Sequence, residues 1–399
     1  MGHLRGGGIK DKVAIIGVGA TKFGENWEWD QYKLLHMAAE EAFGDAGIKN
    51  PQEEIDAIWC GIQYNFTGLS GGTAADGIRI YGKPVTRVEN YCASGMDAFR
   101  NACYGVASGV VDVAYACGVE KLLDEGSAGL PGFKEMGHPI LPLPSAPAMF
   151  CMAAMRCFHE YGWNKEDLAR VAVKNHKNGL KHPKAHFHRE ITIEDAMNAP
   201  MIADPLGRFD CCAMSDGSAG VVITAPELAE SFAHSDDYVL VKANAISVQT
   251  NSPWYHPKFP FTGFPSTQQA AQAAYKEAGI TNPLAKAGQI NVAEVHDCFT
   301  ITELVNCEDM GWVERGKAAQ WYKDGGPEVD GDLAVNPSGG LKCFGHPIGA
   351  TGCRMVQEIT RQLQGRAQGM QRKDAKIGVC HNLGGAFTVA SVTILGMRD

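Results

Sequence analysis

The stretch "AAEEAFGDAGIKNPQEEIDAIWCG", Ala38 to Gly61, has a close counterpart in "AAQAAYKEAGITNPLAKAGQINVAEVHD", Ala270 to Asp297. In each passage an Ala-rich amphipathic segment closes on Ala-Gly-Ile, and a polar turn with Asn-Pro then leads into an apolar strand. Glycine after the last helical turn and proline soon beyond it are signals that end a helix. The pattern therefore indicates that one helix–turn–strand unit occurs twice in the chain.

A second pair of similar passages follows in the same order, "DGSAGVVITAPELA" from Asp216 and "GGAFTVASVTILG" from Gly384. Strands and helices that alternate in two halves predict two similar α/β units. A segment between them is rich in Pro, Met, His and Lys and lacks this alternation, so we expect an inserted loop domain over the functional site. The predicted boundaries are 1–121 with 205–234 for the first half, 122–204 for the insertion and 235–399 for the second half.

Composition places the chain among ordinary soluble globular proteins. It has 399 residues, of which 45% are hydrophobic and 20% charged, enough for two or three domain-sized units. The net charge of −9 argues against a nucleic-acid-binding protein, whereas a small anionic ligand needs only a local basic patch. No apolar stretch is long and uncharged enough to span a bilayer, so no membrane partner is expected.

The thirteen cysteines are scattered, without a Cys-x-x-Cys pair, and the N-terminus does not resemble a signal peptide. This usage predicts a cytoplasmic protein whose thiols are mostly buried and reduced. His182, His186 and His188 cluster in a Lys-rich stretch, but no cysteine lies nearby to complete a zinc set. We therefore expect no metal site.

Cys92 stands in "VENYCASGMDAFRNACYGVASG", between the strand-like "YGKPVTRV" and a segment with helical spacing of apolar residues. A thiol at the start of a helix faces the positive end of the helix dipole, which favours the thiolate. The ordinary alternative is a small buried core residue. We expect that Cys92 uses this position for chemistry.

Three further motifs contain reactive groups. "EVHDCF" places His296 and Cys298 at the end of a predicted strand, where α/β sheets position functional groups. "GHPIGATG" holds His346 between glycine and proline, and "HNLGG" contains Asn382 and glycines whose amides can form an anion-binding nest. A buried thiol, a loop histidine and a simple turn are the ordinary alternatives. Together the motifs supply a nucleophile, a base, a second thiol and oxyanion donors, the components of acyl transfer.

With these motifs the chain resembles the thiolases, specifically the sterol-carrier-protein type with the "HDCF" motif. The resemblance covers nearly all of the chain, from "KVAIIGVGATKFGE" to "VASVTILG". The resemblance implies an α/β fold with a duplicated five-layered α-β-α-β-α core and an inserted loop domain. Other thiolases have Asn-Glu-Ala-Phe in place of "HDCF" and a Cys-x-Gly near the C-terminus, with which Asn382 and Gly384 align. The second catalytic cysteine is then Cys298, although Cys380, two residues too early in this alignment, could compete for the role.

The resemblance also implies the catalytic roles. Cys92 is the nucleophile, His346 its base, and Cys298 the group that protonates the leaving enolate or removes the same proton in synthesis. The side chains of His296 and His346 form one oxyanion hole, and the amides of Cys92 and Gly384 form the other. The reaction is cleavage of a 3-oxoacyl-CoA to acetyl-CoA, or propionyl-CoA, plus a shortened acyl-CoA, or the reverse Claisen condensation.

CoA enters as a substrate, and no covalently bound cofactor is implied. The basic run from Val173 to Glu190 lies in the insertion, and we hypothesise that Lys181 and Lys184 meet the CoA phosphates; a solvated surface run is the alternative. The resemblance implies a role in lipid metabolism and a homodimer formed through a sheet edge beside the nucleophile. A small OB-fold acyl-CoA-binding protein is a further possible partner.

Two other functions remain open at this point. The first is a thiolase-like aldolase or C-acyltransferase that acts with an OB-fold partner, and the second is a non-catalytic acyl-CoA-binding subunit. The presence of Cys92, Cys298 and His346 together favours thiolysis over both. The acyl group, which could be short, branched, aromatic or steroid, and the direction of the reaction do not follow from the sequence.

Overall fold

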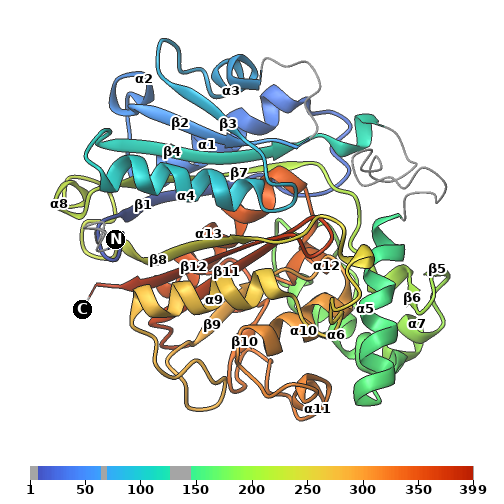
Figure 1. The fold of residues 1–399 in the computed structure, drawn as a ribbon. Helices are drawn as coiled ribbons and strands as arrows, with labels where there is room; N and C mark the ends of the chain where they lie inside the picture. Colours follow the sequence, from blue (N-terminus) through green and yellow to red (C-terminus); the bar gives the residue numbers. More distant parts are fainter. Residues whose placement is uncertain (1–7, 64–69, 126–144, 399) are drawn as a thin grey trace.

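The structure is a computed structural model that describes residues 8–63, 70–125 and 145–398. Its centre is a ten-stranded mixed sheet with the strand order β10-β9-β11-β12-β8-β1-β7-β4-β2-β3 (Figure 1). The first half of the chain supplies β1 (Ala14–Ala20), β2 (Ala57–Gly61), β3 (Val85–Val88), β4 (Val113–Glu120) and β7 (Gly217–Thr224). The second half supplies β8 (Val239–Val248), β9 (Val292–Val295), β10 (Ala334–Val335), β11 (Ile377–Gly384) and β12 (Val389–Met397).

The strand order has an internal symmetry. Read from either end, β3-β2-β4-β7-β1 corresponds to β10-β9-β11-β12-β8, so the two halves have the same topology. The short antiparallel pairing of β1 with β8, Ala14 with Leu240 and Ile15 with Val239, joins the halves edge to edge. The duplication predicted from the sequence repeats is confirmed.

Helices cover the sheet in three layers. The outer helices of the first half are α1 (Gln31–Ala46) and α3 (Ser70–Ile78), and those of the second are α9 (Pro265–Ala278) and α10 (Thr300–Asp309). The middle layer consists of α4 (Ser94–Ala107) and α13 (Ile348–Leu363), which pack on each other and on strands of both halves. The two halves of the sheet and the three helix layers form the five-layered α-β-α-β-α arrangement that the family resemblance implied.

The repeated helices end as their sequences predict. α1 stops at Gly47 with φ of 76° and α9 at Gly279 with φ of 80°, both in the left-handed region. Because a Cβ is strained in this conformation, glycine is the residue that allows the chain to turn into the following strand.

The insertion contains helices rather than only loops. Its described part holds α5 (Ala146–Tyr161), α6 (Lys165–Gly179), α7 (Ile193–Met197) and β5 (Met201–Ala203), which pairs with β6 (Leu206–Gly207). α6 packs against α10, α11 (Ala318–Lys323) and α12 (Gly340–Phe344) of the second half, so the insertion covers that half. The short elements that complete the chain are α2 (Pro51–Glu54), α8 (Pro226–Ala229), η1 (Leu122–Glu125), η3 (Arg208–Asp210) and η4 (Pro253–Tyr255).

The contact between α4 and α13 depends on glycine. A Cβ on Gly95 would lie 2.4 Å from the carbonyl oxygen of Gly349, and a Cβ on Gly352 would lie 2.1 Å from the amide nitrogen of Met96. The first turns of the two helices therefore touch backbone to backbone. Cys92 and His346 each lie two residues before the start of one of these helices, so the crossing brings them together.

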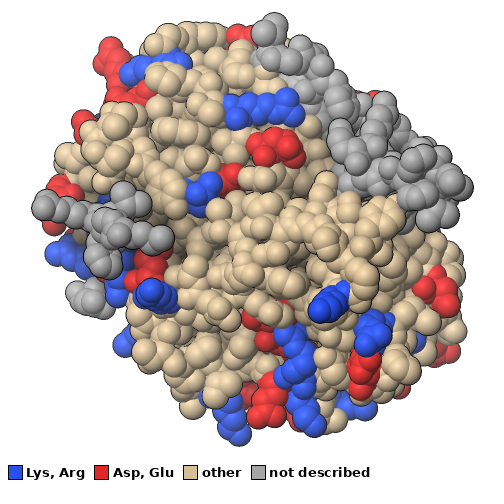
Figure 2. All heavy atoms as spheres, viewed as in Figure 1, with Lys and Arg blue, Asp and Glu red and all other residues tan. Residues whose placement is uncertain are grey.

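Within the described residues, no helix is both long and apolar enough to cross a membrane. On the face of the molecule shown in Figure 2, basic and acidic side chains are interspersed, and uncharged residues cover its centre.

Candidate active site

A tight turn between β3 and α4 presents the thiol of Cys92. Tyr91 has a left-handed φ of 53°, and the amide of Ala93 donates to the carbonyl oxygen of Asn90 at 3.1 Å. Ser94 closes the turn, because its hydroxyl accepts from the Asn90 amide at 2.9 Å and donates to the carbonyl oxygen of Tyr91. A non-glycine residue held at positive φ beside a reactive group is typical of functional sites.

The four predicted catalytic side chains meet in one place. The sulfur of Cys92 and one ring nitrogen each of His296 and His346 lie within 4.8 Å of one another. Cys298 joins them in the wall of a small cavity of about 60 Å³, which all four residues line. Cys380 is fully buried in β11 and is absent from the walls of both cavities described in this section, so the geometry favours Cys298 as the second thiol.

The hydrogen bonds of His346 assign its tautomer. Thr351 donates its hydroxyl hydrogen to the carbonyl oxygen of Pro347 at 3.0 Å, so the hydroxyl oxygen accepts from Nδ1–H of His346 at 2.7 Å. The proton of the neutral ring is then on Nδ1, and Nε2 carries a lone pair. This Nε2 is buried and has no hydrogen-bond partner among the described residues. His346 is thus arranged to accept a proton.

His296 has the opposite tautomer. The Asn382 side-chain amide donates to its Nδ1 at 3.0 Å, which leaves the proton on Nε2. Its backbone carbonyl accepts from the side chain of Asn306 at 2.9 Å, which holds the residue in place. Burial lowers the pKa of His296 well below its usual value, so the ring is neutral. A neutral N–H in this cluster can stabilise an oxyanion.

Burial also controls the protonation of the Cys92–His346 pair. It raises the pKa of the Cys92 thiol far above its ordinary value, with a contribution from Cys212, and lowers the pKa of His346 to about 3. Desolvation thus opposes the helix dipole, which by itself favours the thiolate. Both shifts favour the neutral thiol and the neutral imidazole over the ion pair.

The glycine-rich turn after β11 contributes in two ways. A Cβ on Gly384 would lie 2.4 Å from the carbonyl oxygen of Asn90, so glycine allows this strand to approach the Cys92 turn closely. Gly385, at φ of 65°, lines the small cavity, and its amide donates toward the Cys92 sulfur, which favours the thiolate. The position of the second oxyanion hole at the Cys92 and Gly384 amides stays a prediction, with the Gly385 amide as an additional donor.

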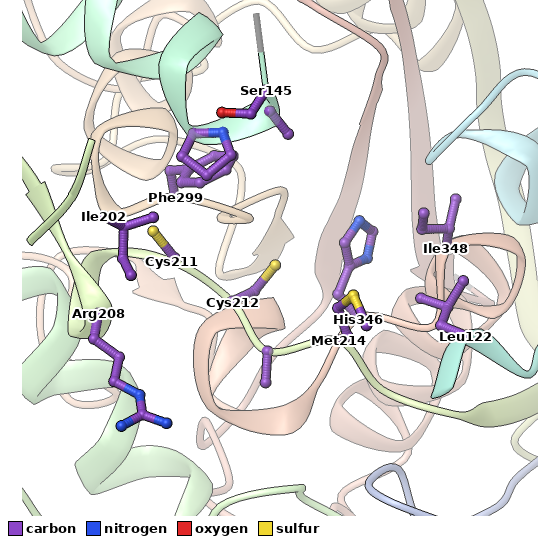
Figure 3. Close-up of a pocket in the computed structure, with 13 residues that line it drawn as sticks. Leu122, Ser145, Ile202, Arg208, Cys211, Cys212, Met214, Phe299, His346 and Ile348 are labelled. Carbon is purple, nitrogen blue, oxygen red and sulfur yellow. The ribbon is translucent and has the colours of Figure 1, made fainter. Parts of the chain in front are cut away.

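A larger cavity of about 670 Å³ adjoins the small one. The two share the lining residues Ala146, Cys212, Phe299 and His346. Figure 3 shows the Cys212 sulfur and the His346 ring facing the same space, with Arg208 at one end of the lining residues. Arg208 is exposed and is the one basic side chain, lysine or arginine, among the described residues that line this cavity.

The two lysines predicted to bind CoA lie outside both cavity walls. Lys184 forms an ion pair with Glu41 and donates to the carbonyl oxygen of Ala20 at 2.6 Å, so its charge holds the insertion to the first half. Lys181 is exposed. Their contact with CoA stays a prediction.

Sequence reasoning missed three residues of this site, Thr351, Arg208 and Cys212. Thr351 lies within the quoted "GHPIGATG", one turn into the helix that follows His346. Its short distance from His346 along the chain could have identified it from the sequence as a candidate partner of the imidazole. Nothing in the sequence around Arg208 or Cys212 distinguishes them, because only the folded chain places them on the cavity wall.

A buried cysteine, a histidine base, a second thiol and a neutral histidine donor around one cavity form a site for thiol-dependent acyl transfer. Residues 13–227 match the family described as "Thiolase, N-terminal domain", and residues 250–397 match "Thiolase C-terminal domain-like". The chain belongs to the thiolase family.

Relatives of known name fall in the same family. The chain is 38% identical to "Acetyl-CoA acetyltransferase" of Methanothermobacter thermautotrophicus, over 96% of this chain and 98% of the relative. It is 29% identical to "Sterol carrier protein 2" of Homo sapiens, over 97% of this chain and 73% of that protein. The solved structure "Ltp2-ChsH2(DUF35) aldolase" superposes with a TM-score of 0.84 at 26% identity and covers 98% of each chain.

Proposed function

We propose that the protein is a thiolase that transfers an acyl group between CoA and acyl-CoA through a covalent Cys92 thioester. The observation that carries the proposal is the cluster of the Cys92 sulfur with ring nitrogens of His346 and His296 within 4.8 Å, in which the buried Nε2 of His346 is unpartnered. The similarity to acetyl-CoA acetyltransferases supports the same reaction class.

The first half-reaction forms the acyl-enzyme. The Cys92 sulfur bonds to the 3-carbonyl carbon of a 3-oxoacyl-CoA while His346 Nε2 takes the thiol proton. Collapse of the tetrahedral intermediate breaks the bond between carbons 2 and 3. The departing enolate of acetyl-CoA, or propionyl-CoA from a branched substrate, receives a proton from Cys298. His296 Nε2–H stabilises the enolate oxygen, and loss of one such donor typically costs roughly 100- to 1,000-fold in rate.

The second half-reaction restores the enzyme. A new CoA thiol gives its proton to the Cys298 thiolate as its sulfur attacks the Cys92 thioester. The bond to Cys92 breaks, and the imidazolium of His346 returns the proton to the departing Cys92 sulfur. The same steps in reverse give Claisen condensation, in which Cys298 removes the proton from acetyl-CoA. Only side chains of this chain and CoA take part, so we propose no bound cofactor and no metal.

We propose that the larger cavity holds the pantetheine arm of CoA. Its volume is about 670 Å³, and its lining residues include His346 and Arg208, whose guanidinium can contact a phosphate. We propose Arg208 as a phosphate contact, in addition to Lys181 and Lys184 from the sequence prediction.

Partners and location are also part of the proposal. β3, which leads into the Cys92 turn, is the terminal strand of the sheet, and a second copy of the chain can pair with such an edge. We propose a homodimer formed there. All thirteen cysteines are free, as expected in a reducing cytoplasm. Lipid metabolism is the proposed context.

A thiolase-like aldolase that works with an OB-fold partner is the second candidate, favoured by the close superposition on a structure whose title names an aldolase. Incubation of the purified protein with acetyl-CoA and acetoacetyl-CoA, followed by intact-protein mass spectrometry, separates the two. A thiolase shows an acetyl adduct that Cys92→Ser abolishes. Absence of the adduct, together with release of an aldehyde or ketone from a 3-hydroxyacyl-CoA, would establish the aldolase instead.

A further inference from the structure

The cluster of Cys92, His296 and His346 has the donor atoms and nearly the spacing of a metal site. The Cys92 sulfur and one ring nitrogen of each histidine lie within 4.8 Å of one another. Around a tetrahedral zinc ion, with Zn–S of about 2.3 Å and Zn–N of about 2.0 Å, such atoms lie roughly 3.3–3.6 Å apart. A contraction of at most about 1.5 Å is needed, which rotation of the three side chains can supply.

Each imidazole has one nitrogen left for an ion. In His346 the Nδ1 atom is bonded to Thr351 at 2.7 Å, so Nε2 is the nitrogen that remains. This Nε2 is buried, has no hydrogen-bond partner among the described residues and carries a lone pair in the tautomer that Thr351 assigns. His346 is therefore already in the neutral form that a metal ion binds. In His296 the Nδ1 atom is bonded to Asn382 at 3.0 Å, so Nε2 remains there too.

The Asn382 side chain can prepare His296 for an ion. Its amide oxygen is buried and has no partner in the part of the chain that the structure describes. A half-turn of the amide places this oxygen at Nδ1 of His296, where it accepts the Nδ1 hydrogen and leaves a lone pair on Nε2. Metal-bound histidines usually donate their second N–H to an oxygen in this way. The acyl-transfer steps give the Asn382 oxygen no role, whereas a bound ion does.

The donor set and its surroundings suit zinc. One thiolate and two imidazoles match the sulfur and nitrogen ligands that Zn²⁺ prefers, whereas Mg²⁺ and Ca²⁺ prefer oxygen. The three residues are at most 9% exposed. Arg354, the buried cation whose charge reaches both histidines, is paired with Glu294 at 2.5 Å, which offsets its repulsion of an ion. Three protein ligands leave the fourth tetrahedral position for a small molecule in the cavity of about 60 Å³.

We propose that Cys92, His296 and His346 form a site for Zn²⁺ that inhibits the enzyme reversibly. A sulfur–zinc bond replaces the S–H bond of Cys92, the thiol proton is released to solvent, and no electron is transferred. The ion then occupies both the sulfur that attacks the substrate and the lone pair that takes the thiol proton. The reaction proposed above uses no metal, so the ion acts only against it. This inhibition rests on the proposed function, whereas the binding of the ion does not.

The binding test uses Co²⁺ as a spectroscopic probe, added to the purified, reduced and metal-free full chain. A near-ultraviolet charge-transfer band reports a thiolate ligand, and strong visible absorption reports tetrahedral geometry. We expect one equivalent of Co²⁺ to produce both signals after equilibration. One equivalent of Zn²⁺ should then remove them, because nitrogen and sulfur sites bind Zn²⁺ more tightly than Co²⁺.

Ligand variants locate the ion. Cys92→Ser and His346→Ala each remove one ligand and should weaken Co²⁺ binding by at least about 100-fold. The serine variant changes a single atom, so the test survives if the alanine variant does not fold. Cys211→Ser is the matched control, because Cys211 lines the larger cavity but lies outside the cluster; its affinity for Co²⁺ should equal that of the wild type.

Variants of Asn382 test the switch of the His296 tautomer. Asn382→Leu removes the oxygen that accepts the Nδ1 hydrogen, and its Co²⁺ affinity should fall by about 10- to 100-fold. Asn382→Asp keeps an oxygen at that position and should bind Co²⁺ at least as tightly as the wild type. A merely structural role of Asn382 would weaken binding in both variants, and that result would reject the tautomer switch.

Inhibition is measured separately, as the rate of acetyl-Cys92 formation from acetyl-CoA by intact-protein mass spectrometry. Zinc that fills the site should lower this rate by at least about 10-fold, a chelator should restore it, and prior acetylation of Cys92 should abolish the Co²⁺ signals. No Co²⁺ signals in the wild type, or equal signals in Cys92→Ser, would overturn the site, and unchanged acetylation of the zinc-loaded protein would overturn the inhibition. Co²⁺ bound as expected without any acetyl adduct in the metal-free protein would support the site and reject the proposed thioester chemistry.

Discussion

Replacement of Thr351 by valine removes the one hydroxyl that fixes the tautomer of His346. Valine has the same shape as threonine, so the change deletes the hydrogen bond to Nδ1 at 2.7 Å and the bond to the Pro347 carbonyl at 3.0 Å without opening a cavity. A buried N–H left without a partner costs about 1–3 kcal/mol. The ring avoids this cost by moving its proton to Nε2, which no longer accepts the thiol proton.

The expected loss follows from that free energy. At about 1.4 kcal/mol per tenfold, a penalty of 1–3 kcal/mol lowers the rate of Cys92 acylation by roughly 5- to 150-fold. Thr351 lines neither cavity, so KM for acyl-CoA should stay near the wild-type value. The assay is single-turnover acylation by acetyl-CoA, quenched and read by mass spectrometry, with steady-state thiolysis of acetoacetyl-CoA for kcat and KM.

Thr351→Ser is the matched control, because it keeps the hydroxyl and loses only a methyl group. We expect the serine variant to acylate Cys92 nearly as fast as the wild type. Wild-type acylation by the valine variant, or equal losses in the serine and valine variants, would refute the assignment of the His346 tautomer.

Four further predictions follow from the site. Because burial lowers the pKa of His346 to about 3, its neutral form persists as pH falls, so kcat/KM should show no inflection near the ordinary histidine value of 6.5; such an inflection would mean that the ring is solvated. The raised pKa of the Cys92 thiol predicts slow alkylation by iodoacetamide at pH 7 and faster reaction as pH rises above 9, whereas rapid, pH-independent labelling would indicate a thiolate. Cys298→Ala should still form acetyl-Cys92 but should lose thiolysis and exchange of acetyl-CoA methyl protons by roughly 100-fold or more; retained proton exchange would move this role elsewhere. Arg208→Ala should raise KM for CoA by roughly 10-fold with kcat little changed, against Lys181→Ala as the comparison variant; a rise only in the lysine variant would place the phosphates at the sequence-predicted run.

Local sequence was sufficient for much of the architecture. The repeated passages after Ala38 and Ala270 predicted equivalent helices, and both end at left-handed glycines, Gly47 and Gly279. Such stop signals act within a few residues, so they can be read along the chain. The same holds for Cys92, whose placement just before a segment with helical spacing of apolar residues is visible without coordinates.

The assembly of the site required the tertiary structure. Nothing local says that α4 and α13 cross through Gly95 and Gly349, and this crossing is what brings Cys92 to His346. The protonation of Cys92 also depends on the whole fold. The helix dipole is a local effect that favours the thiolate, whereas desolvation by distant segments raises the pKa of the thiol. Desolvation is the larger of the two effects. Phe150 of the insertion likewise stacks on Phe299 of the second half, a contact between segments that are remote in the chain.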